Sequence, residues 1–266
     1  MKRGSLIIMS YFKMTLLAIV QLFLAVLLQN VILSIIYVTY GSFNNHMSDE
    51  VSYIMGMMAV VVTGFIYAFR YRAITRGSTY EGGRKKNKEI IMGSNIVIFI
   101  SLAIGSQFLI SGVMNLIKPL FESLFTDYTQ IMDQLLGANL SIVLIYGIIV
   151  APITEELIFR GVILYYCWNN GSFFAANVCQ AVLFGLYHGN IVQGIYAGLL
   201  GLLLGYVRNK YKTITAPILL HIMINASGFL LIIFPSNILV YVIMCLLGGS
   251  LLVSGIMKIK TIKYWL

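Results

Sequence analysis

Three short groups of polar side chains interrupt long apolar stretches of this sequence, and their types are those that hydrolytic enzymes use. A pair of glutamates is followed by an arginine, and two histidines come later, one of them four residues before an asparagine. Ionisable groups cost at least a few kcal/mol each inside a membrane, so they are candidates for function by default. The candidate residues are Glu155, Glu156, Arg160, Phe184, His188, His221 and Asn225.

The spacing of the acidic group predicts different roles for the two glutamates. On a helix Glu156 and Arg160 are four residues apart, so their side chains can pair on one face. Glu155 is turned by about 100° from that face and has no partner in register. We therefore expect Glu156 to be structural and Glu155 to be available for chemistry.

The later groups predict two polar helix faces. His221 and Asn225 are one turn apart, and so are Phe184 and His188, so each pair projects from one face of its helix. The third histidine, His46, falls in a loop between apolar segments. We expect the two polar faces to meet the acidic helix.

A carboxylate that activates water is the chemistry that this set supports best. A desolvated glutamate can act as a general base on water. His188 could bind and orient that water, while His221 and the amide of Asn225 could donate hydrogen bonds to the oxyanion of a tetrahedral intermediate. Such a site would hydrolyse amides directly and would need no cofactor.

Other chemistries have weaker support in the sequence. It contains no H-E-x-x-H segment, no aspartate in an apolar stretch and no serine in a glycine-flanked nucleophile motif. One rival remains, because Glu155, His188 and His221 are also a two-histidine, one-carboxylate set for zinc. An ion or proton transporter would also use intramembrane Glu and Arg, but no inverted repeat is evident.

Eight apolar segments must position these residues. Of 266 residues 59% are hydrophobic and only 10% are charged, which excludes an ordinary water-soluble globule. Helices satisfy their own backbone groups in lipid. We predict an all-α integral membrane protein with about eight transmembrane helices, forming one polytopic domain (1–266) with a catalytic core at about 139–234. The segments are 14–40, 51–69, 95–117, 139–165, 173–189, 191–207, 213–234 and 238–257.

The charged flanks of these segments predict the orientation. The formal net charge is +9, but the basic residues lie in short flanks between apolar runs, which argues against nucleic acid as a partner. With eight spans, most basic flanks fall on one side and most acidic ones on the other, so both termini are expected in the cytoplasm. The basic flanks hold Lys2, Arg3, Lys13, Arg70, Arg72, Arg76, Arg84, Lys85, Lys86, Lys88, Arg208, Lys210, Lys212, Lys258, Lys260 and Lys263; the other side holds Asp49, Glu50, Glu122, Asp127 and Asp133 with Lys118.

Glycines also recur through the segment 191–207. They are spaced by three or four residues and include two G-x-x-x-G patterns, at Gly194, Gly198, Gly201 and Gly205. Such spacing lets a neighbouring helix approach closely. We therefore predict a tight helix–helix contact here.

The ordered motifs resemble those of a known family. Their arrangement is similar to that of the CPBP family, the CAAX-protease and bacteriocin-processing membrane endopeptidases also called Abi or Rce1-like glutamate proteases. The resemblance implies that Glu155 activates water with the help of His188, that His221 and Asn225 stabilise the oxyanion, and that the other motif residues support them. The motifs are Glu155-Glu156-x-x-x-Arg160, Phe184-x-x-x-His188 and His221-x-x-x-Asn225.

The resulting hypothesis is a metal-independent intramembrane glutamate endopeptidase of a bacterial cytoplasmic membrane. Its partners would be the lipid bilayer and a peptide or membrane-protein substrate that enters between helices from the cytoplasmic side. Members of the family differ in task, from peptide or bacteriocin maturation to self-immunity, and the motifs do not choose among these tasks. The alternative is a non-catalytic immunity or regulatory protein that binds a membrane partner, such as a sensor kinase or a bacteriocin receptor.

Overall fold

The computed structural model describes residues 2–43, 48–77, 90, 93–137, 139–231 and 234–262. These residues form helices joined by turns, with no strand among them, which confirms the predicted all-α class. The elements are α1 (Lys2–Gly41), α2 (Asp49–Thr75), α4 (Gly93–Ile117), the short 3-10 helix η1 (Lys118–Leu120), α5 (Glu122–Gly137), α6 (Leu140–Ile145), η2 (Tyr146–Val150), α7 (Ala151–Glu156), η3 (Leu157–Ile163), α8 (Leu164–Asn170), α9 (Phe173–Tyr187), α10 (Ile191–Tyr211), α11 (Thr215–Leu230) and α12 (Ile238–Thr261).

Six helical runs in the described part of the chain are long and apolar enough to cross a membrane, so this is a multi-pass membrane protein. All eight predicted segments are helical, but the helices Phe173–Tyr187 and Thr215–Phe229 are shorter than a span. With 15 residues and a rise of about 1.5 Å per residue, α9 is about 22 Å long, less than the roughly 30 Å of the hydrocarbon core. The predicted count of eight spans is therefore not confirmed. The spanning runs are Leu6–Gly41, Glu50–Thr75, Asn95–Leu120, Leu140–Asn170, Ile191–Tyr211 and Ile238–Thr261.

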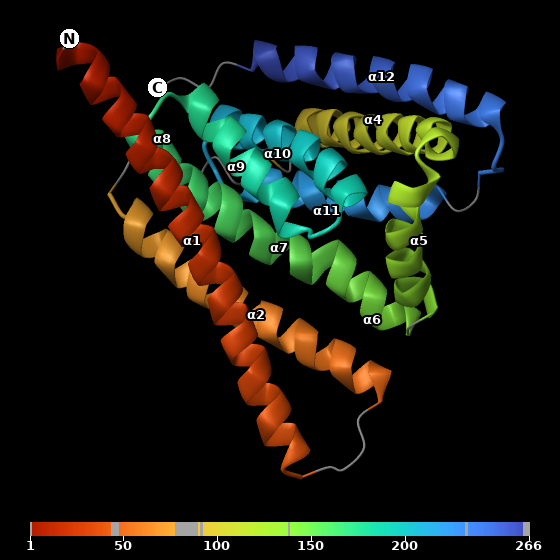
Figure 1. The fold of residues 1–266 in the computed structure, drawn as a ribbon. Coiled ribbons are helices and arrows are strands. Elements are labelled where there is room, and N and C mark those ends of the chain that lie inside the picture. Colours follow the sequence, from red (N-terminus) through yellow and green to blue (C-terminus); the bar gives the residue numbers. More distant parts are fainter. Residues whose placement is uncertain are drawn as a thin grey trace.

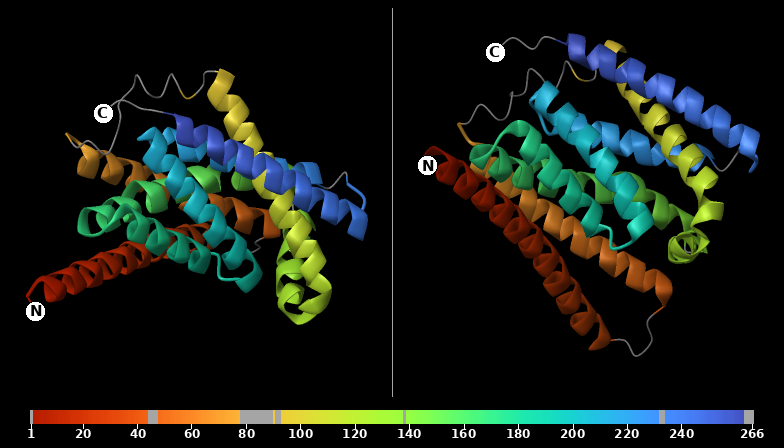
Figure 2. Two further views of the ribbon diagram at one scale, coloured as in Figure 1. Left: turned by 90° about the horizontal axis from the view of Figure 1, so that it is seen from above. Right: turned by 45° about the horizontal axis from the view of Figure 1, so that its top comes forward.

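The helices pack in a continuous series around a central run, α6 to α8 (Figure 1). On one side of this run lie α1 and α2, and on the other the α9–α10 hairpin, followed by α11 and then the α4–α12 pair (Figure 2). The first turn of α1 and the last turns of α2, α8 and α12 lie toward the same end of the molecule, while α5 lies at the opposite end. The central run, which carries both candidate glutamates, is thus enclosed by helices from both halves of the chain.

The α9–α10 hairpin is held by glycines, as predicted. A Cβ atom added at Gly185 would lie 2.5 Å from the carbonyl oxygen of Gly194, so the two backbones are in contact there. One turn further along, the Gln180 amide donates to the Gly201 carbonyl oxygen at 2.9 Å and to the Asn177 side chain at 2.8 Å. This close contact fixes the turn at the end of α9, where His188 lies.

The central run departs from α-helical geometry on both sides of α7. The stretches η2 and η3 are π-helical, and Pro152 stands at the start of α7. Each π-helical turn holds an extra residue, which rotates the side chains that follow it. The run is fixed against α2, because the Thr154 hydroxyl donates to the Val60 carbonyl oxygen at 3.3 Å and Gly64 leaves room for the Thr154 side chain.

Two features differ from the sequence interpretation. The amphipathic helix α5 lies between the predicted segments 95–117 and 139–165 and was not predicted. Arg208 was expected to lie in a flank, but it is fully buried within α10 and donates to the Tyr71 hydroxyl at 3.0 Å. Some of the predicted positions concern side chains outside the described set. These are the loop position of His46 and the flank positions of Lys2, Arg3, Arg84, Lys85, Lys86, Lys88 and Lys263.

Candidate active site

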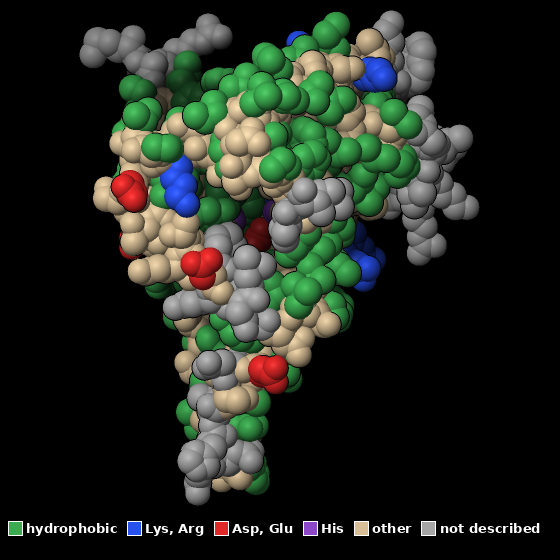
Figure 3. All heavy atoms as spheres, turned by 90° about the vertical axis from the view of Figure 1, so that its right-hand side faces the viewer, with side chains coloured by type: hydrophobic (Ala, Val, Ile, Leu, Met, Phe, Trp, Pro, Cys, Tyr) green, Lys and Arg blue, Asp and Glu red, His purple; other side chains and the backbone are tan. Residues whose placement is uncertain are grey.

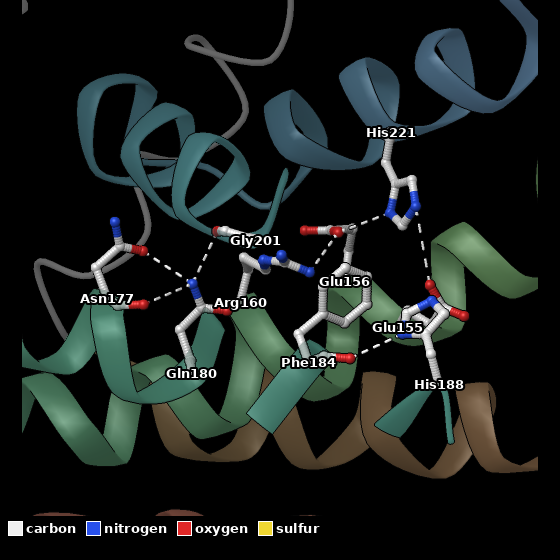
Figure 4. Close-up of polar contacts among 9 residues, drawn as sticks. All are labelled: Glu155, Glu156, Arg160, Asn177, Gln180, Phe184, His188, Gly201 and His221. Carbon is white, nitrogen blue, oxygen red and sulfur yellow. Dashed lines mark hydrogen bonds and ion pairs between the residues drawn. The ribbon is translucent and has the colours of Figure 1, made fainter. Parts of the chain in front are cut away.

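Glu156 is the buried centre of the polar cluster (Figure 4). Its side chain is 0% exposed, and one carboxylate oxygen, Oε1, accepts from Arg160 Nη1 and contacts His221 Nδ1, both at 2.8 Å. The i,i+4 pairing of Glu156 with Arg160 is as the spacing predicted. The contact with His221 joins α11 to the central run across 65 residues of sequence. A carboxylate oxygen can only accept when ionised, so Nδ1 of His221 carries the proton in this contact.

Glu155 lies on the other side of His221. Its Oε2 atom is 3.8 Å from His221 Nε2, and its side chain is 14% exposed whereas that of Glu156 is fully buried. The separation is within ion-pair range but too long for a hydrogen bond. Glu155 was expected to have no partner in register on its own helix, and His221 from α11 approaches it.

His188 caps the C-terminus of α9, at the start of the turn to α10. Its Nδ1 atom is 2.8 Å from the Phe184 carbonyl oxygen, which can only accept a hydrogen bond. Nδ1 is therefore protonated, and in the neutral ring Nε2 is left with a lone pair. Figure 4 shows the His188 and Glu155 side chains projecting into the same space.

The Phe184 ring is the apolar surface that separates and orients these groups. It lies edge-on to His188 at 4.8 Å and to His221 at 5.9 Å between ring centroids. The Arg160 guanidinium carbon is 4.3 Å from the ring centroid, a cation–π distance. Phe184 itself is 1% exposed, so a single buried ring contacts three of the predicted site residues.

Asn225 has a contact that the sequence interpretation missed. Its amide donates to the carbonyl oxygen of Gly147 at 2.7 Å. In η2 the backbone N–H of Ala151 bonds to the carbonyl five residues earlier, that of Tyr146. The next donor in this pattern would be Pro152, which has no N–H, so the Gly147 carbonyl needs another partner. Asn225 is that partner. The sequence signal for this contact is the pair Pro152 and Asn225, which are 73 positions apart.

Histidine and acidic side chains are visible from one end of the bundle. Figure 3 shows that end, with a hollow at whose floor histidine and acidic side chains are visible. Of the two site glutamates, Glu155 is the one with exposed area. Among the described residues no three side chains of His, Cys, Asp or Glu are grouped in a way that could hold a metal ion.

Comparisons with known proteins match this part of the chain. Residues 137–227 match the family model described as Type II CAAX prenyl endopeptidase Rce1-like. The predicted resemblance to CAAX proteases is thereby confirmed. A Bacillus subtilis (strain 168) protein named "Putative membrane peptidase YdiL" is 29% identical over 100 residues, which make up 38% of this chain and 41% of that protein. The match thus spans about two fifths of the relative's length. No solved structure matches.

The Rce1-like region, residues 137–227, runs from the end of α5 into α11 and contains all seven predicted site residues. Within it the structure brings Glu155, Glu156, Arg160 and His221 into one polar cluster, with Phe184 and His188 beside it. The Asn225 side chain instead donates to the Gly147 carbonyl oxygen in η2. The π-helical turns and the role of the Gly147 carbonyl were not foreseen, because the two residues that indicate them, Pro152 and Asn225, are far apart in the sequence.

Proposed function

We propose that this protein is an intramembrane endopeptidase in which Glu155 activates a water molecule to hydrolyse a peptide bond. The observation that carries the proposal is the division of labour between the two glutamates. Glu156 is fully buried and engaged by Arg160 and His221, whereas Glu155 is partly exposed and has one oxygen near the His221 ring. The similarity to a CAAX prenyl endopeptidase model and to a named membrane peptidase supports a proteolytic activity.

In the proposed reaction a water molecule lies between Glu155 and the lone pair on Nε2 of His188. Glu155 accepts a proton as the water oxygen attacks the scissile carbonyl carbon, and the carbonyl oxygen becomes an oxyanion. His221, when doubly protonated, keeps Nδ1–H on Glu156 and directs Nε2–H toward the oxyanion. Collapse of the intermediate breaks the C–N bond, and Glu155 returns the proton to the departing nitrogen.

In this proposal Asn225 acts mainly by holding the central run. One N–H of its amide is engaged with Gly147 in the structure, and the second is left to assist His221 at the oxyanion. Glu156, Arg160 and Phe184 position the two histidines rather than touch the substrate. The proposed substrate is a peptide or a membrane-protein segment.

Comparing cells that carry wild type or Glu155→Gln tests the proposal. The amide is nearly isosteric but cannot take up the proton, so we expect specific cleaved fragments in the membrane proteome to disappear. Removing a general base or an oxyanion donor lowers rates by about 10²–10³-fold, so His221→Ala should abolish the same fragments. Glu122→Gln on α5, an exposed position, is the matched control for charge removal and should retain them.

Unchanged fragments in Glu155→Gln and His221→Ala, at matched protein levels, would contradict the proposal. The polar cluster would then act in binding a membrane partner, as expected for an immunity or regulatory protein. Identified fragments would in addition define the substrate.

Metal independence is tested with purified protein and a fragment-derived peptide. Because the proposed water is activated by Glu155 without a metal ion, treatment with EDTA or 1,10-phenanthroline should leave the hydrolysis rate unchanged. Loss of activity that zinc restores would instead favour a zinc site built on Glu155, His188 and His221.

A further inference from the structure

The helix α1 lies along the outer edge of the bundle (Figure 1, Figure 2). Only 17% of the residues in its apolar stretch are buried inside the molecule, whereas the share for α10 is 44%. One face of α1 packs against α2, α8 and α9, and Met14, Ala18, Gln21 and Ala25 are buried on that face. The opposite face of α1 is not covered by the described part of the chain.

Two polar side chains interrupt this uncovered face. Asn30 and Ser34 are both exposed and lie four residues apart, so they project from the same side of α1. The distance along the helix axis from the exposed Lys13 to Asn30 is about 25 Å, which is less than the roughly 30 Å of the hydrocarbon core. Asn30 therefore lies within the membrane, and Ser34 lies one turn nearer to its far surface.

The hydrogen bonds of Asn30 differ from those of the residue before it. Gln29 accepts from the Tyr187 hydroxyl of α9 at 3.0 Å, so its side chain is engaged within the bundle. Asn30 donates one amide N–H to the Val26 carbonyl oxygen of its own helix at 2.8 Å. No described residue pairs with its Oδ1 atom or its second N–H. Lipid tails offer neither donor nor acceptor, so this amide gains from a partner on another helix.

Asn30 and Ser34 continue a regular stripe of exposed side chains. Large apolar residues precede them at alternating steps of four and three residues, and each is at least 40% exposed. This spacing is typical of the seam along which two parallel helices pack. A single amide in such a seam fixes the register of the two helices. The α1 stripe consists of Leu16, Val20, Phe23, Leu27, Asn30 and Ser34.

We infer that the α1 stripe is the interface with a second copy of this chain in a parallel dimer. The charged flanks insert every copy with the same orientation. A two-fold axis along the membrane normal then brings like residues together at equal depth. An amide holds both a donor and an acceptor, so the Asn30 side chains of the two copies satisfy each other. A partner without a polar group at this depth would leave Asn30 unpaired. The interface uses no residue of the candidate site, so it does not depend on the proposed function.

Cross-linking of single-cysteine variants in native membranes tests the interface. Phe23→Cys and Ser34→Cys each place a thiol on the α1 stripe. Leu24→Cys and Ile35→Cys are the matched controls, because these neighbouring positions are also exposed but are turned by about 100°. Copper phenanthroline then oxidises pairs of thiols that meet. The native cysteines, which are first replaced by alanine, are Cys167, Cys179 and Cys245.

We expect a disulfide-linked dimer from the two stripe variants and monomer from the two controls. Equal cross-linking of all four variants would indicate random collisions and would contradict the inference. Monomer from both stripe variants, or dimer from the controls alone, would also overturn it.

The contribution of Asn30 is measured by energy transfer between dye-labelled copies in phosphatidylcholine liposomes at several protein-to-lipid ratios. Asn30→Leu is similar in size but has no amide, and it should raise the dissociation constant of the dimer by about 5- to 30-fold. Asn30→Gln keeps the amide and should restore much of the association. Thr39→Val removes a polar group from another face of α1 and should leave the dissociation constant unchanged.

The unfolding temperature separates lost association from misfolding. Asn30 is exposed, so Asn30→Leu should unfold at the same temperature as wild type at dilutions where both are monomeric. Equal dissociation constants for wild type and Asn30→Leu would contradict the role of the amide. A wild-type protein that is monomeric at every protein-to-lipid ratio would assign the α1 stripe to a different membrane protein and overturn the inference.

Discussion

At the scale of single residues, two adjacent glutamates occupy different environments because a helix turns by about 100° per residue. Glu156 faces the buried side, where Arg160 and His221 share one of its oxygens. Glu155 is 14% exposed and has one oxygen 3.8 Å from Nε2 of His221. The same chemical group is thus structural at one position and available for reaction at the next.

The contrast predicts different effects on stability for the two Glu→Gln variants. Glu156→Gln removes the carboxylate that pairs with the fully buried Arg160, which should lower the free energy of unfolding by about 3 kcal/mol or more. Glu155→Gln removes a partly exposed carboxylate and should change stability by less than about 1 kcal/mol. Equilibrium unfolding in detergent measures both values. Equal losses in the two variants would contradict the assignment of Glu156 as the structural residue.

At the scale of elements, the central helical run depends on a hydrogen bond between two distant segments. Pro152 cannot satisfy the Gly147 carbonyl, and the Asn225 amide of α11 does so at 2.7 Å. The π-helical stretch η2, which precedes α7, sets the rotation of Glu155 and Glu156. α11 therefore acts on the site both directly, through His221, and through the backbone of η2.

A double-mutant cycle tests this connection. Asn225→Ala in the wild-type chain should cost about 1–3 kcal/mol, because the Gly147 carbonyl loses its donor in a low-dielectric region. Pro152→Ala supplies a backbone N–H that can bond to Gly147, so Asn225→Ala should cost clearly less in that background. The coupling free energy should therefore be at least about 0.5 kcal/mol. Additive costs would show that Pro152 and Asn225 act independently.

At the scale of the whole molecule, the site depends on the close approach of α9 and α10. His188 lies in the turn between them, and the backbones touch where Gly185 meets Gly194. Any separation of the two helices moves His188 away from the space that it shares with Glu155.

Gly185→Ala should therefore impair both folding and function. The added Cβ would lie 2.5 Å from the Gly194 carbonyl oxygen, so the helices must move apart at a cost of about 1–3 kcal/mol. We expect a lower unfolding temperature and fewer Glu155-dependent fragments. Gly249→Ala in α12 is the control, because no atom lies within 4 Å of its added Cβ and helix propensity favours alanine. Equal behaviour of the two variants would contradict the packing argument.

The sequence by itself determined the membrane class, the helical segments and the identity of the candidate residues. Apolar length and isolated ionisable groups such as Glu155 and His221 depend only on composition and order, so they can be read without coordinates. The i,i+4 pairing of Glu156 with Arg160 was also predictable, because it lies within one helix. The G-x-x-x-G spacing likewise predicted a close helix contact at Gly194, but not that its partner is Gly185.

Only the tertiary structure decided which partner each polar group has. The contact of His221 with Glu156 joins residues 65 positions apart, and that of Asn225 with Gly147 joins residues 78 apart. Such contacts depend on helix rotation and depth, and one π-helical turn changes both. The burial of Arg208 and the position of the hollow have the same origin, since burial is a property of how helices pack and not of the order of residues in one of them.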